Sequence, residues 1–184
     1  MTERSDLANL RALGDPRVHD WAGAPEPIGA GLVEWTRRAV GHDQSLAVRV
    51  ALDACQLVVA DYAARPPKLP PRSYLDGMLA AIRAWQSAPD RDHREAVRLA
   101  LDVTRERHAW QTDEDDPQFW ILEAVDHTCL AVWAGERASY ILPVDFATTT
   151  GRVVACVFHA MRSAGRDEPR AAGAVIDAVM QATA

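Results

Sequence analysis

The chain has 184 residues and a mass of 20.2 kDa, with 48% hydrophobic and 25% charged residues, which is typical of one globular domain. A formal net charge of −6 argues against nucleic acid as the partner. The longest run without a charged residue has nine residues, as in 153–161, whereas a membrane-spanning helix needs about 20 apolar ones. The N-terminal sequence lacks the pattern of a secretory signal, and three cysteines without paired spacing favour the reducing cytoplasm.

The elements expected along the chain are helices separated by prolines. Alanine, the best helix former, occurs 33 times, and the 11 prolines fall where helices should start or stop. We expect about seven helices, and the candidate ranges are 3–13, 31–40, 43–64, 72–87, 90–112, 117–137, 144–164 and 170–183. Asp43, Asp116 and Asp167 stand where N-caps are needed. The segment 14–31 is rich in Gly, Pro and Ala and is predicted to be a surface arm or an irregular crossing.

Hydrophobic spacing indicates how these helices are buried. The range 72–87 carries a single apolar stripe made of Leu75, Met78, Leu79, Ile82 and Trp85. The ranges 43–64 and 117–137 are apolar around most of their circumference, so both are expected in the middle of the structure. No segment shows the alternation or the turns of β-hairpins. The prediction is therefore a single all-α domain over 1–184, built as a helical bundle or a short helical array.

The array alternative comes from one internal similarity. The heptapeptide at 47–53, Ala-Val-Arg-Val-Ala-Leu-Asp, recurs at 96–102 with one change, Val to Leu. The offset of 49 residues is close to that of two-helix solenoid repeats. Chance similarity between Ala-rich helices is the preferred explanation, because only two copies are visible and solenoids usually need three or more.

The residues that could carry chemistry form one weak pattern. Cys156 and His159 lie one helical turn apart and could share a zinc ion, but a structural site needs two more ligands. The neighbours His127 and Cys129 point to nearly opposite sides of a helix. The chain contains none of the common nucleophile, phosphate-loop or dinucleotide motifs. We therefore assign no catalytic residue, no cofactor and no metal, and keep an enzyme or metal protein using Cys156 and His159 as an alternative.

An acidic run gives the candidate binding site. Asp113, Glu114, Asp115 and Asp116 join two predicted helices, and Trp110 stands directly before them. A run of carboxylates attracts a basic surface, and tryptophan is a common interface anchor. These five residues are the predicted site for a protein partner with a basic surface, although a solvated loop would have the same composition.

A resemblance agrees with this interpretation. The helix at 43–64, the phrase Ala-Ala-Ile-Arg-Ala-Trp at 80–85 and the helix that follows resemble parts of all-helical, Ala-rich immunity proteins of bacterial polymorphic-toxin systems. The similarity covers about 43–133 and supplies no defined functional residues. It implies neutralisation of a toxin by stoichiometric binding, without catalysis. A structural adaptor module is the remaining alternative.

Overall fold

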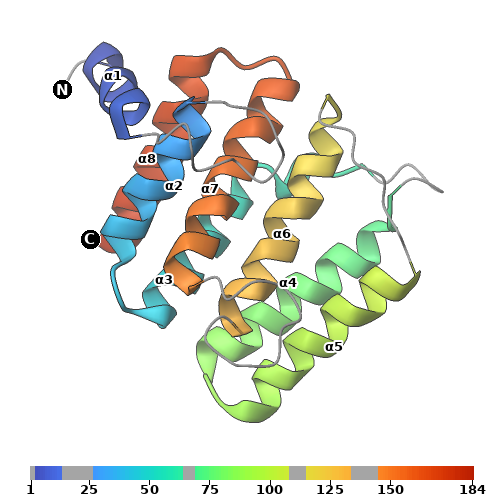
Figure 1. The fold of residues 1–184 in the computed structure, drawn as a ribbon. Helices are drawn as coiled ribbons and strands as arrows, with labels where there is room; N and C mark the ends of the chain where they lie inside the picture. Colours follow the sequence, from blue (N-terminus) through green and yellow to red (C-terminus); the bar gives the residue numbers. More distant parts are fainter. Residues whose placement is uncertain (1–2, 14–26, 64–68, 108–114, 134–144) are drawn as a thin grey trace.

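The computed structural model describes residues 3–13, 27–63, 69–107, 115–133 and 145–184. Within these ranges the chain forms eight α-helices, one short 3-10 helix and no strand (Figure 1). The helices are α1 (Glu3–Leu13), α2 (Pro27–Val40), α3 (Gln44–Gln56), α4 (Arg72–Ser87), α5 (Arg91–Arg107), α6 (Pro117–Trp133), α7 (Phe146–Ser163) and α8 (Glu168–Thr183), with the 3-10 helix at Val59–Asp61. The all-α class is confirmed, and each of the eight α-helices corresponds to one of the eight candidate ranges.

Two helices form the centre of the structure. In α6 almost every residue is buried, and in α7 most are, and these two helices pack against each other more extensively than any other pair. Helices α3, α2 and α8 cover α7 on one side, while α4 and α5 form a hairpin against α6 on the other (Figure 1). All of them contribute to one hydrophobic core. None of the described helices has the length and apolar character that a membrane span requires.

Helix boundaries follow local signals in most places. Asp43, Asp145 and Asp167 each accept a hydrogen bond from the backbone N–H three residues later, as N-caps do. Asp116 accepts one from the N–H of Gln118 at 2.9 Å, so it caps α6 as expected. The stripe predicted for 72–87 is the buried face of α4, residue for residue.

Two boundaries differ from the expectation. Helix α2 begins at Pro27 instead of near 31, so residues 27–31 of the expected arm are helical, because proline is well suited to the first helical position. Residues 14–26, the rest of that arm, lie outside the described ranges. The helix expected over 43–64 ends at Gln56, and a turn leads into Val59–Asp61.

Side-chain amides fix α6 at both ends. Gln118, in its first turn, accepts a hydrogen bond from the N–H of Ala63 at 2.5 Å and donates one to the carbonyl of Asp61 at 3.1 Å. At the other end, Gln44 donates to the last carbonyls of α6, at Ala131 and Val132. These bonds satisfy backbone groups that a helix end leaves unpaired, and they tie α6 to the α3 region. Helix α6 is therefore a fixed support for the hairpin of α4 and α5.

Candidate functional site

Helix α5 is the outer helix of the hairpin and has one buried stripe. Val97, Leu101 and Thr104 are buried against α4 and α6, which are the helices it contacts most among the described residues. This stripe has the i, i+4, i+7 spacing of an amphipathic helix. The opposite side of α5 faces solvent and is available to a partner.

The solvent side of α5 is apolar in its middle. Among the described residues only three large hydrophobic side chains are exposed, and two of them, Leu99 (50%) and Val103 (39%), stand one turn apart on α5. Ala96, also exposed, precedes Leu99 on the same side. We refer to Ala96, Leu99 and Val103 as the α5 ridge. Single exposed hydrophobic residues are ordinary, whereas several in register on one helix are typical of a contact surface.

Ion pairs border the α5 ridge. Arg98 bonds to Glu95 and to Asp102, the latter at 2.7 Å, so charges of both signs line this side of the helix. The hydrogen bond from Arg98 lowers the pKa of Glu95, which therefore stays ionised. The pairs are largely exposed and contribute little to stability, but they give the ridge a polar border.

A buried ion pair anchors the far end of α5. Arg105 donates two hydrogen bonds to Asp126 of α6, at 2.8 and 2.6 Å. Asp126 is 2% exposed, whereas the Arg105 side chain is 36% exposed. Burial opposes the charge on Arg105, but the hydrogen bonds and the charge of Asp126 outweigh it and raise the pKa of the guanidinium. The forked geometry ties the C-terminal half of α5 to α6.

Asp126 belongs to a cluster of buried ionisable residues on α6. Glu123, Asp126 and His127 are each at most 5% exposed, and we call them the α6 polar cluster. The Nδ1 atom of His127 lies 2.9 Å from the carbonyl oxygen of Glu123, so this nitrogen carries the proton in the neutral ring. Burial lowers the pKa of His127 despite the nearby Asp126. The ring is therefore neutral at physiological pH and packs as part of the interior.

The predicted acidic site is only partly within the described residues. Trp110, Asp113 and Glu114 lie outside them. Asp115 is exposed, and Asp116 is half-buried with its carboxylate on the first turn of α6. Asp115 is thus placed to meet a partner, while Asp116 has a structural role as an N-cap.

The alternative site, Cys156 and His159, has an aromatic environment. His159 stacks on Trp120 of α6, with ring centroids 4.6 Å apart and planes 26° apart, while Cys156 is 3% exposed. In the described part of the chain no three His, Cys, Asp or Glu side chains come together as a metal site would require. The geometry thus places Cys156 and His159 at the α6–α7 contact.

The other two cysteines are inert small residues of the core. Cys55 and Cys129 are both fully buried among apolar residues of the core. Burial raises the pKa of Cys55 to about 12 and that of Cys129 well above its usual range. A thiol with such a pKa is not a nucleophile at neutral pH.

The α5 ridge was not among the residues proposed from the sequence, although a signal exists. The inner stripe of this helix contains Val97, Leu101 and Thr104, and Leu99 and Val103 are large apolar residues outside it. Apolar residues off the buried stripe are the pattern that would have identified the ridge. No protein family, curated protein or solved structure matches the chain. Its function must therefore be argued from the surface itself.

Proposed function

We propose that this protein acts by stoichiometric binding of another protein, in the manner of an immunity protein, without catalysis. The observation that carries the proposal is the α5 ridge, where Leu99 and Val103 are exposed side by side on a helix that is otherwise strongly amphipathic. Burying such a pair against a partner would contribute favourable free energy, at about 25 cal/mol for each Å² of apolar area.

The surroundings of the ridge favour a protein with a basic rim as the partner. Interfaces combine an apolar centre with a polar border, and the ridge is bordered by the ion pairs of Arg98. The chain continues from the C-terminal end of α5 into the acidic run that ends at Asp115 and Asp116. An apolar groove flanked by lysine or arginine would match the ridge and this acidic end together.

The resemblance to immunity proteins of toxin systems supports the same proposal, because those proteins neutralise a toxin by binding to it. The setting that we propose is the cytoplasm. The three cysteines are free and buried, and free thiols persist in a reducing compartment.

The proposal can be tested with a photo-crosslinking residue placed at position 99 in the native host. The protein that is crosslinked is then purified separately and mixed with the chain, and light scattering gives the stoichiometry. Titration calorimetry compares the Leu99→Ser/Val103→Ser double variant with Met180→Ser. Met180 is 58% exposed on α8 and serves as the matched control.

The expected result is a 1:1 complex. We expect the double variant to raise Kd by about tenfold or more, as for truncated interface anchors, and Met180→Ser to bind like the wild type. Equal affinity of the double variant and the wild type would refute binding through α5. A complex that forms only when it contains several copies of the chain and proteins other than the crosslinked one would instead support the adaptor alternative.

A further inference from the structure

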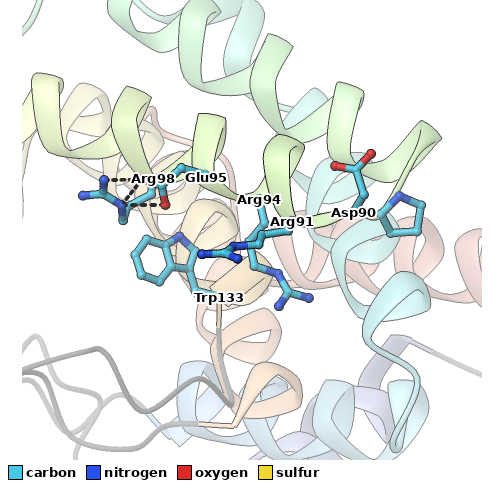
Figure 2. Close-up of a pocket in the computed structure, with 7 residues that line it drawn as sticks. Asp90, Arg91, Arg94, Glu95, Arg98 and Trp133 are labelled. Atoms are coloured by element: carbon cyan, nitrogen blue, oxygen red, sulfur yellow. Dashed lines mark hydrogen bonds and ion pairs between the residues drawn. The ribbon is translucent and has the colours of Figure 1, made fainter.

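A cavity of about 350 Å³ lies between the start of α5 and the end of α6. It is lined by Pro89, Asp90, Arg91, Arg94, Glu95, Arg98 and Trp133. In Figure 2 the Arg91 and Arg94 side chains extend beside the Trp133 indole, with Arg98 and Glu95 to one side and Asp90 to the other. This volume falls at the lower end of the range for small-molecule sites, about 300–1,000 Å³.

The charges on the cavity wall leave an excess of positive charge. Asp90 accepts hydrogen bonds from the backbone N–H of His93 at 2.8 Å and from its ring nitrogen at 2.9 Å, so it serves as the cap of α5. Glu95 forms an ion pair with Arg98. Within the described residues these two carboxylates bond to His93 and Arg98, and the charge of Arg91 acts on Glu95 only at longer range, where it lowers the pKa of that carboxyl. Arg91 is therefore available to an anion that enters the cavity.

Trp133 supplies a second kind of contact. Its indole forms a flat apolar wall at the end of α6. The Nε1 atom is buried and has no hydrogen-bond acceptor in the described part of the chain. Because this atom has almost no accessible surface, the contact that Trp133 offers to a ligand is the apolar face of its indole.

We propose that this cavity binds a small organic anion that carries a phosphate or carboxylate group beside a planar ring. The anionic group would accept the forked hydrogen bonds of Arg91, for which guanidinium geometry is suited, with the positive charge of Arg94 beside it. The planar ring of the ligand would stack on the indole of Trp133. The proposal does not depend on the protein-binding function, because the α5 ridge is formed by other side chains of the helix.

The test uses nuclear magnetic resonance of the indole N–H groups. The signal of Trp133 among the six tryptophans is assigned with Trp133→Phe. The probes that combine ring and charge are adenosine 5′-monophosphate and indole-3-acetate, which separate phosphate from carboxylate. Adenosine offers a ring without the charge, and inorganic phosphate offers the charge without the ring.

We expect at least one of the two combined probes to shift the Trp133 signal saturably. Its Kd should be at least tenfold lower than that of adenosine or phosphate. Arg91→Gln should weaken this binding by tenfold or more. Arg83→Gln is the matched control, because Arg83 is an exposed arginine on α4 that does not line the cavity. Circular dichroism confirms that both variants fold. The proposal is overturned if neither combined probe binds at millimolar concentration, or if phosphate alone binds as tightly as the better combined probe. It is also overturned if Arg91→Gln binds that probe with the affinity of the wild type.

Discussion

Individual buried charges distinguish α6 from the rest of the core. Asp126 lies in an apolar interior where an unpaired carboxylate would be costly, and Arg105 supplies the opposite charge from α5. His127 resolves the same problem differently, because its imidazole remains neutral and donates to the carbonyl of Glu123. The sequence showed Glu123, Asp126 and His127 as neighbours, but it could not show that Arg105 from another helix would reach them.

The neutral state of His127 predicts how stability changes with pH. Its pKa in the folded protein is lowered by burial, whereas the unfolded chain titrates near the usual value of about 6.5. Below pH 6.5 His127 therefore binds a proton in the unfolded state more readily than in the folded state. The free energy of unfolding should be fully maintained above this pH and should fall as pH decreases from about 6.5 to 5. The slope contributed by this residue approaches at most about 1.4 kcal/mol per pH unit.

Urea unfolding between pH 5 and 8 measures this slope. The control is His127→Gln, which keeps a donor for the Glu123 carbonyl and cannot gain a proton. The carboxylates with lowered pKa, such as Asp90 and Asp145, lose their stabilisation only at lower pH, near and below their unfolded values of about 4. If His127→Gln retains the slope of the wild type, the pH dependence arises from other groups.

At the scale of helices, position and boundary were predictable where one face is buried. The stripe of α4 gave the correct range because polar and apolar residues separate clearly around the helix. Helix α6, apolar around most of its circumference, lies at the centre as expected, whereas α3 covers α7 and is buried over about half of its residues. The start of helix α2 was harder to predict, because glycines in its first turns are unfavourable to a helix. Only the tertiary packing shows why glycine is needed there. Gly31 lies directly against the backbone of Leu10, where a side chain would collide.

The approach of α7 to α2 gives a second prediction. A Cβ atom on Gly151 would lie 2.6 Å from the carbonyl oxygen and 2.8 Å from the Cα of Val33. Both contacts are with backbone, so Gly151→Ala must push the two helices apart. Overpacking costs about 1–3 kcal/mol and exceeds the gain of about 1 kcal/mol from replacing a helical glycine. We expect a net loss of about 1 kcal/mol in the free energy of unfolding, measured in urea.

Gly77 provides the matched control. It is an exposed glycine inside α4, and a Cβ atom there would meet nothing within 4 Å. Gly77→Ala should therefore raise the free energy of unfolding by up to about 1 kcal/mol. The two substitutions are chemically identical and should change stability in opposite directions. A stabilising effect of Gly151→Ala would contradict the close helix contact.

At the scale of the whole molecule, the sequence predicted the class of the fold but not the arrangement of the helices. Several helices share Ala-, Val- and Leu-rich faces of similar width, so no pattern specifies that α7 packs on α6 and α2. The recurrence at 47–53 and 96–102 illustrates this limit. The first copy is in α3, where Val50 is buried, whereas its counterpart Leu99 in α5 is exposed. Nearly identical heptapeptides thus serve as core in one place and as surface in another.

The candidate binding surface was predictable only in part for the same reason. The acidic run is visible as charge, and it places Asp115 at the start of α6. The α5 ridge becomes visible only when the buried stripe of α5 is known from its packing on α4 and α6. In the sequence the two are linked because the chain passes from α5 through the acidic run into α6.

The acidic end of this surface gives the last prediction. In the triple variant Asp113→Asn/Glu114→Gln/Asp115→Asn, the partner identified through position 99 should associate several-fold more slowly at low salt, with less change in dissociation. Exposed charges at the rim of an interface act mainly by long-range steering. Stopped-flow mixing measures both rates. The difference from the wild type should shrink between 0.1 and 1 M salt, because the Debye length falls from about 10 to 3 Å.

Asp116 is retained in the triple variant because it caps α6 through the N–H of Gln118. Asp116→Ala, made separately, should cost about 1 kcal/mol of stability, and the triple variant should cost almost none. This difference separates an effect on recognition from an effect on folding. An association rate of the triple variant equal to that of the wild type at low salt would place the interface away from the acidic run. The α5 ridge would then have to bind the partner without electrostatic steering from its C-terminal end.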